Sequence, residues 1–185
     1  YIGLFGTITT ISTLGAIVIV TSISAKLGKR KTFILATSLT FLGSLLKWFC
    51  YDPLVPWKVL LPAPLRAFGM GALFTLMGSM IADVCDMDEL QSHERREGMF
   101  GSIYWWVVKL GMAAALAIGG VMLNATGFDV ALAGEQTEQT LLMMRLFDIV
   151  VPLVFSAIAI WLIASYPITE KVAAEVRQSL EARRG

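Results

Sequence analysis

The chain has 185 residues, of which 56% are hydrophobic and only 16% are charged, and its mean hydropathy is +0.71. A soluble domain carries about 45–50% apolar and about 25% charged residues, so this composition excludes an ordinary soluble fold and indicates lipid around much of the chain. The net charge of only +1 leaves no basic surface for nucleic acid. We therefore expect a membrane protein with membrane lipid, and no nucleic acid, among its partners.

Five apolar segments are long enough to cross a bilayer, which needs about 20 residues in a helix. Backbone groups in lipid must pair within the segment, which at these lengths leaves only helices. The predicted spans, in chain order, cover residues 2–25, 32–51, 61–84, 98–124 and 140–166. The expected fold class is all-α: a polytopic transmembrane helical bundle, with a five-helix domain over 1–166 and a tail over 167–185.

The connections between these spans alternate in charge. Ten basic residues fall after the first span, before the fourth or after the fifth, against two in the other connections. Because cytoplasmic connections carry the excess of Lys and Arg, we expect a multi-pass protein of the inner (plasma) membrane with a cytoplasmic C-terminus. Five spans that start outside, in a chain that opens within an apolar run, indicate an assembly that lacks its first helix. We expect the chain to be a piece of a longer protein.

The tail has Val172, Val176 and Leu180 at a spacing of four, which is enough for a short amphipathic helix on the cytoplasmic face. A frayed, solvated tail is the alternative.

Lys109 is the one charge in the fourth span. It lies twelve residues beyond Glu97, which is about 18 Å along a helix and near the middle of the bilayer. Charges at that depth are costly and are functional candidates by default. Trp105 lies on the same predicted helix face, and Tyr104 flanks it. We interpret Lys109 as part of a polar cavity, and the alternative is a structural ion pair between two helices.

Four carboxylates crowd the cytoplasmic end of the third span: Asp83, Asp86, Asp88 and Glu89. This is the negative end of the helix dipole, where each acid costs about 0.3–1 kcal/mol. Arg95 and Arg96 follow within a short turn and are the expected compensation. Such a charge cluster can hold one state of a gated protein closed, and the alternative is a charge-balanced, solvated loop.

Two further features concern structure and metal binding. Arg145 and Asp148 are three residues apart in the fifth span, so we expect them to pair on one helix face. His93 is the only histidine and has no Cys or His at ligand spacing, so no metal site is expected. We also expect no catalytic residues and no cofactor.

Several short motifs together resemble one family of carriers. They are Gly28-Lys-Arg30, Ile81-Ala-Asp-Val-Cys-Asp86, Arg95-Arg-Glu-Gly98, Tyr104, Lys109-Leu-Gly111, Gly127-Phe128 and Tyr166-Pro-Ile-Thr-Glu170. The pattern is similar to that of the glycoside–pentoside–hexuronide:cation symporters, the melibiose-permease-like branch of the major facilitator superfamily. The resemblance covers the whole chain as helices eight to twelve, a C-terminal half without its first helix, and its most specific part spans residues 83–111.

The resemblance implies roles for particular residues. Asp83, Asp86 and Glu89 match an acidic loop, and Arg95 its basic partner, which together form a cytoplasmic gate. Lys109 matches a lysine beside the coupling cation and the sugar, and the cation, Na⁺ or H⁺, is left open. Tyr104 and Trp105 stand at a pocket-facing pair that is Gln-Thr in a galactoside carrier, so galactoside specificity does not carry over. Phe74 aligns with an aromatic residue near the sugar.

The function implied is cation-coupled symport of a sugar, glycoside or uronide by alternating access, together with an N-terminal half of the same chain that bears the cation-site carboxylates. Three alternatives stay open: a lysolipid symporter of the same superfamily, a membrane enzyme that holds Mg²⁺ on Asp83 and Asp86, and a non-transporting receptor that kept the fold.

Overall fold

In a computed structural model of the chain, residues 2–52, 55–132 and 134–184 are described, and these residues form helices without strands. The long helices are α1 (Ile2–Leu27), α2 (Lys29–Cys50), α3 (Ala63–Ser92), α4 (Glu97–Ala125) and α5 (Glu138–Ala164), and they are followed by the shorter α6 (Glu170–Arg184). Two 3₁₀ turns, η1 (Pro56–Leu60) and η2 (Val130–Leu132), lie in the connections. The predicted all-α class is confirmed.

The third helix differs most from its expected span. It was expected to end near residue 84, but it continues for two more turns to Ser92, so the acidic residues lie on a helix rather than in a loop. His93 ends it in the left-handed conformation (φ 63°) and donates its backbone N–H to the Glu89 carbonyl at 2.9 Å. The hydropathy of the sequence marks the membrane boundary, whereas the helix is limited only by its cap.

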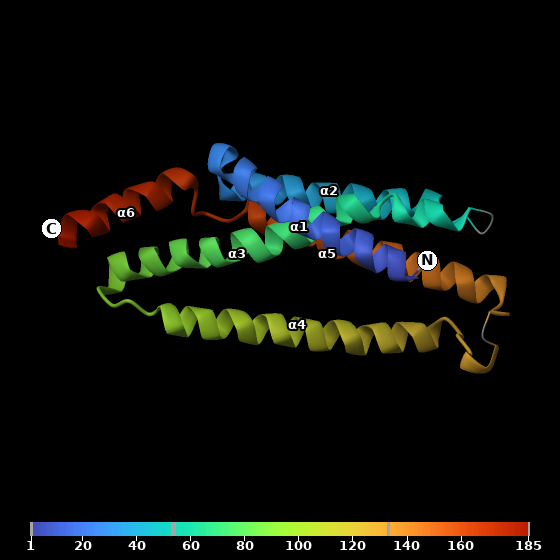
Figure 1. Cartoon of the computed structure of the whole chain (residues 1–185). Coiled ribbons are helices and arrows are strands. Elements are labelled where there is room, and N and C mark those ends of the chain that lie inside the picture. The colour runs from blue at the N-terminus through green and yellow to red at the C-terminus, as the bar shows by residue number, and fades with distance from the viewer. Residues whose placement is uncertain (1, 53–54, 133, 185) are drawn as a thin grey trace.

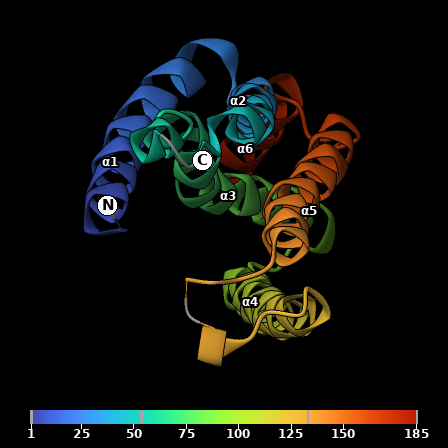
Figure 2. The same ribbon diagram turned by 90° about the vertical axis from the view of Figure 1, so that its right-hand side faces the viewer.

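Helices α1, α2 and α3 form the packed centre of the fold. The central cluster consists of Val20 from α1, Phe33 and Ala36 from α2, and Ala72, Leu76 and Met80 from α3. Helix α5 packs along α2, on the side away from α1. Helix α4 stands apart from this group (Figures 1 and 2), and none of its described residues is buried.

The tail forms the helix that was one of its two expected states, but it packs against protein. Helix α6 lies beside the end of α3 (Figure 1). Ala173, Val176 and Leu180 are buried, and Arg183 donates a 3.0 Å hydrogen bond to the Leu90 carbonyl. The division into a membrane domain over 1–166 and a tail over 167–185 stays a prediction, and its outermost residues, 1 and 185, lie outside the described part.

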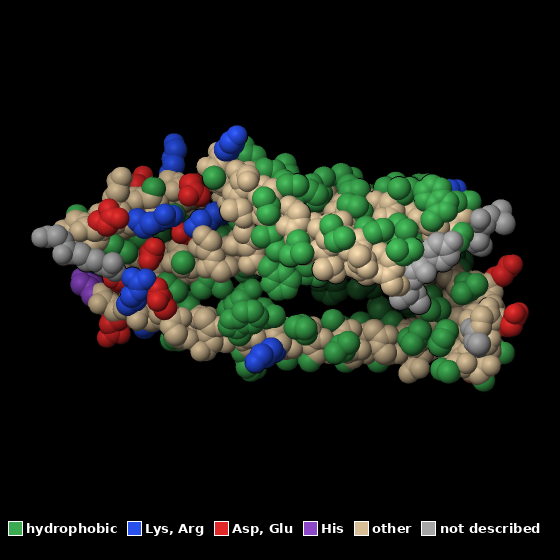
Figure 3. All heavy atoms as spheres, viewed as in Figure 1, with side chains coloured by type: hydrophobic (Ala, Val, Ile, Leu, Met, Phe, Trp, Pro, Cys, Tyr) green, Lys and Arg blue, Asp and Glu red, His purple; other side chains and the backbone are tan. Residues whose placement is uncertain are grey.

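All five long helices are long and apolar enough to span a membrane. On the face seen in Figure 3, most charged side chains gather at the end of the molecule where α6 lies and a few lie at the opposite end, while the middle is largely hydrophobic apart from a basic side chain on the lower helix. This distribution suits a bilayer around the middle and water at both ends.

Candidate functional site

Lys109 is exposed on helix α4, twelve residues from the first residue of the helix, as the spacing predicted. Its side chain borders a shallow hollow of about 600 Å³ together with Ser102, Trp105 and Trp106. No ion pair or hydrogen bond joins it to any residue that the structure describes. The alternative of a lysine that joins two helices through an ion pair therefore finds no support among the described residues, and the ammonium group is open to a partner from elsewhere.

Three aromatic residues lie near this lysine, but only two of them line the hollow. Trp105 and Trp106 line the hollow, whereas Tyr104 lies beside it and meets Trp105 edge to face, with ring centroids 5.2 Å apart. Such aromatic surfaces suit stacking of a sugar ring or contact with an apolar tail.

No contact among the described residues joins Phe74 to Lys109. The Phe74 ring is 63% exposed on α3. Phe74 does not line the hollow at Lys109 either.

Asp83 is the centre of an ionic cluster at the end of the molecule where α6 lies. Its carboxylate, 8% exposed, accepts a 2.6 Å hydrogen bond from Lys29 Nζ at the start of α2 and a 3.3 Å bond from Arg177 on α6. Lys29 also donates to the Ser79 carbonyl at 3.3 Å. One buried carboxylate thus joins α2, α3 and α6, and the sequence motifs did not reveal these partners.

The other members of the acidic group are paired differently from Asp83. Arg95 binds Glu89 at 3.2 Å and also Glu97, and the hydrogen bond to Glu97 raises the pKa of this exposed guanidinium. Arg95 and Glu89, two residues of the expected gate, thus form an ion pair, whereas Asp83 pairs with Lys29 and Arg177 instead of Arg95.

The remaining acids of this group are Asp88 and Asp86. Arg96 donates to Asp88 at 2.9 Å. Asp86 forms no ion pair within the described part of the chain. The four acids of the sequence motif therefore do not share one set of partners, because α3 turns them toward different neighbours.

Hydrogen bonds between side chains and backbone groups join the helices at the same end of the molecule. Gly28 separates α1 from α2 in a left-handed conformation (φ 82°), and a Cβ atom here would lie 3.4 Å from a carboxylate oxygen of Glu170. That carboxylate accepts from the Lys29 backbone N–H, and Arg30 donates to the Ala164 carbonyl at the end of α5. The basic motif at 28–30 therefore anchors α5 and α6 to the α1–α2 turn.

A second polar cluster, at the opposite end of the bundle, corrects one expectation. Asp148 of α5 pairs with Lys47 of α2 and accepts a 2.5 Å hydrogen bond from the Tyr51 hydroxyl. Arg145 instead donates to the Trp48 carbonyl and stacks over the Trp48 ring at 4.4 Å. The expected Arg145–Asp148 pair is wrong, because the two side chains turn to different groups on α2.

The signal for this contact was present in the sequence. Lys47 and Asp148 are opposite charges in two different spans, and charges within spans tend to pair.

Comparison with known proteins identifies the family. The family model described as MFS/sugar transport protein matches residues 1–170. The chain belongs to this family. The resemblance stated from the motifs is thereby confirmed, and the chain is part of a multi-pass membrane protein of the major facilitator superfamily.

Individual relatives agree with this assignment. The chain is 26% identical to a glucuronide carrier protein homolog of Escherichia coli over 94% of its length, and 28% identical to an isoprimeverose transporter of Lactiplantibacillus pentosus over 88%. It is 35% identical to an uncharacterized symporter of Synechocystis over 62%. The chain spans only 37%, 34% and 22% of the lengths of these three relatives. No solved structure matches it.

Proposed function

We propose that this chain is the C-terminal part of a secondary carrier that couples a Na⁺ or H⁺ gradient to symport of a sugar, glycoside or uronide. The observation that carries the proposal is the family match over 1–170, together with relatives named for a glucuronide and for isoprimeverose. In such carriers, two halves rock around a site near the middle of the membrane. The N-terminal half and its cation-site carboxylates belong to the remainder of the polypeptide.

In this proposal Lys109 and the tryptophans of the hollow face the substrate. The lysine is near the middle of the bilayer, has no described partner and lies beside Trp105 and Trp106. A cation at that depth requires an anionic partner, which a uronide carboxylate or an acid of the N-terminal half would provide. Tyr104 and Phe74 are assigned to the wall of the site rather than to direct ion contacts.

The Asp83 cluster is proposed as the fixed side of a cytoplasmic gate. Asp83 holds α2, α3 and α6 together, while Glu89 and Arg95 lie nearer the surface, where a partner half can reach them. Asp86, which has no ion pair among the described residues, is the acid we assign to contact with that other half. This assignment places the C-terminus on the cytoplasmic side of the plasma membrane.

The pairing of Asp83 also disfavours the membrane-enzyme alternative. Two cations, Lys29 and Arg177, already occupy both oxygens of this carboxylate, and Mg²⁺ needs oxygen ligands at about 2.0–2.1 Å in octahedral geometry. The relatives are carriers by name, so we propose that the chain has no catalytic function.

The test uses the full-length polypeptide reconstituted in liposomes. Uptake of labelled glucuronides, xylose-containing disaccharides and a lysolipid is followed under imposed Na⁺ or H⁺ gradients. We expect gradient-driven accumulation of a sugar derivative, and we expect Lys109→Ala to abolish it while the protein stays folded. Lys31→Ala is the matched control, because Lys31 is exposed at the start of α2 and has no described partner.

Three results would count against the proposal. Accumulation of the lysolipid alone would move the function to the lysolipid branch of the superfamily. Full activity of Lys109→Ala would remove the lysine from the coupling machinery. No flux of any substrate from a folded protein would favour the receptor.

A further inference from the structure

Three cations form a basic cluster at the end of the molecule where α1 turns into α2: Arg30 and Lys31 on α2, and Lys171 on α6. Glu170 lies against Gly28, and this contact brings the start of α6, and with it Lys171, to the turn. The two lysines are exposed, and Figure 3 shows basic side chains projecting from this end of the molecule.

The described residues leave the charge of the basic cluster largely uncompensated. Arg30 donates to a backbone carbonyl, that of Ala164, and not to an acid. The two lysines form no ion pair or hydrogen bond with any described residue. The carboxylate of Glu170, which is next in the chain to Lys171, already accepts the Lys29 backbone N–H. The basic cluster is therefore open to an anion from outside the chain.

An apolar stripe begins at Lys31 and runs the length of α2. Leu35, Leu42 and Phe49 lie four, eleven and eighteen residues beyond the lysine, which is close to one, three and five helical turns. All three are exposed, and the opposite face of α2 supplies the central cluster. From Lys31 to Phe49 the stripe is about 27 Å long, close to the thickness of a bilayer core.

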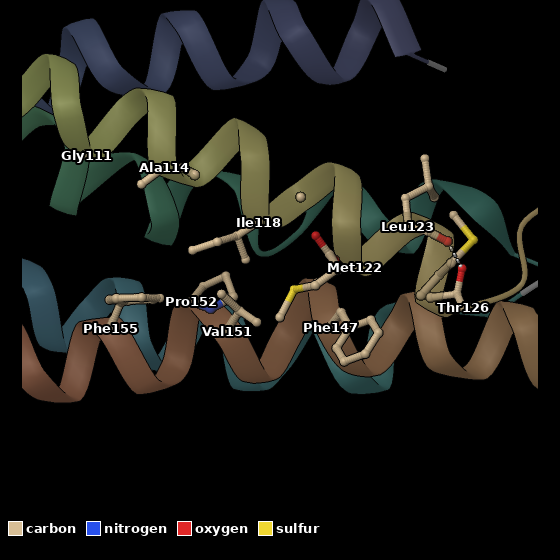
Figure 4. A pocket seen from close by; sticks show the side chains of 14 residues that line it. Gly111, Ala114, Ile118, Met122, Leu123, Thr126, Phe147, Val151, Pro152 and Phe155 are labelled. Atoms are coloured by element: carbon tan, nitrogen blue, oxygen red, sulfur yellow. Dashed lines mark hydrogen bonds between the residues drawn. The ribbon is translucent and has the colours of Figure 1, made fainter.

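The composition of the stripe indicates lipid beside it. Contacts between membrane helices favour small residues, and such residues are present elsewhere in the chain: Gly111 and Ala114 of α4 line the groove between α4 and α5 (Figure 4). The α2 stripe instead presents leucine and phenylalanine side chains, with exposed Leu45 and Leu46 beside them. Acyl chains along this face place a lipid headgroup at the level of Lys31.

We propose that the basic cluster binds the phosphate headgroup of an anionic phospholipid, whose acyl chains lie along the apolar stripe of α2. The ammonium groups attract phosphate as compact charges, and Arg30 keeps N–H donors beyond the one that bonds Ala164. An anionic headgroup is favoured over a zwitterionic one, because the amine of the latter adds positive charge to a cluster that already has an excess. This binding is independent of the sugar and the cation proposed above.

The test measures lipid binding to the full-length polypeptide in detergent by native mass spectrometry, with phosphatidylglycerol and phosphatidylcholine as probes. We expect the first phosphatidylglycerol molecule to bind more tightly than the first phosphatidylcholine molecule. Lys31→Gln and Lys171→Gln should each weaken the binding of phosphatidylglycerol about fivefold, which is the contribution of one basic residue near an anionic lipid surface.

Lys26→Gln is the matched control. Lys26 is also exposed and has no described partner, but it belongs to α1, which lies on the side of α2 away from α5. We expect this variant to change the affinity by less than about twofold, because a charge outside the site is screened. Equal losses from Lys26→Gln and Lys31→Gln would overturn the proposal in favour of a diffuse surface charge. Equal affinities of the unaltered protein for the two lipids would overturn it as well.

A headgroup without acyl chains distinguishes a lipid site from a site for a soluble anion. An excess of glycerol 3-phosphate should leave phosphatidylglycerol bound, because it lacks the apolar contact with α2, and full displacement would refute the assignment to a lipid. In liposomes of phosphatidylcholine alone the basic cluster has no anionic lipid to bind, so Lys31→Ala serves as the uptake control there. Flux without the lipid preference would remove this proposal alone, and the lipid preference without flux would remove only the proposed function.

Discussion

Asp83→Asn should destabilise the protein far more than Asp86→Asn, although the two acids share one motif. Asp83 is 8% exposed, and its loss leaves Lys29, itself only 18% exposed, without its carboxylate. Removing one partner of a buried ion pair costs about 3–5 kcal/mol. Because the new amide still accepts a hydrogen bond and Lys29 retains the Ser79 carbonyl, we expect a loss of about 2–3 kcal/mol.

Asp86 supplies the matched control, since it has the same chemistry three residues away and no described ion pair. A pair that Asp86 makes with the other half near the protein surface contributes about 0–1 kcal/mol, so its substitution by Asn should change the free energy of unfolding by less than about 1 kcal/mol. The measurement is unfolding of the full-length polypeptide by SDS in mixed micelles, followed by circular dichroism. Equal losses for the two variants, or no loss from Asp83→Asn, would refute the cluster as the structure describes it.

Two other predictions follow from helix contacts. A double-mutant cycle of Lys47→Ala and Asp148→Ala should give a coupling of about 1–3 kcal/mol in the same unfolding measurement, because the two side chains pair across α2 and α5; additive effects would contradict that contact. Gly69→Ala should cost about 1–3 kcal/mol, because the new Cβ would lie 2.2 Å from the Thr40 hydroxyl oxygen. Gly78→Ala, where a Cβ meets no described atom within 4 Å, should be neutral or stabilising by up to about 1 kcal/mol. Equal effects of the two glycine substitutions would rule out the close contact at Gly69.

Local properties account for the part of the fold that could be predicted. Whether a segment spans a membrane depends on its own length and apolar content, so the five spans were recognisable, as was the position of Lys109 along α4. The end of α3 was misplaced because hydropathy falls at the edge of the lipid, whereas the helix continues in water until His93 caps it.

Partners of charged groups depend on packing. The sequence shows which charges lie within or at the ends of spans, but it does not show which of them meet. Asp83 meets Lys29 and Arg177 from 54 and 94 residues away, and Asp148 meets Lys47 from 101 residues away. Local rules favoured short-range pairs such as Arg145 with Asp148, but a three-residue spacing only permits such a contact. Which side chain is nearest is decided by how α2, α3, α5 and α6 are placed against one another.

In the candidate site, too, some properties follow from the sequence and others from the packing of the helices. The chemistry of the site, a lysine among aromatic residues in a span, is visible in the order of residues on one helix. Its exposure on α4 and the hollow that it shares with Trp105 and Trp106 arise only when the helices pack. A helix face is a property of the sequence, because side chains recur every 3.6 residues, but what that face meets is a property of the bundle.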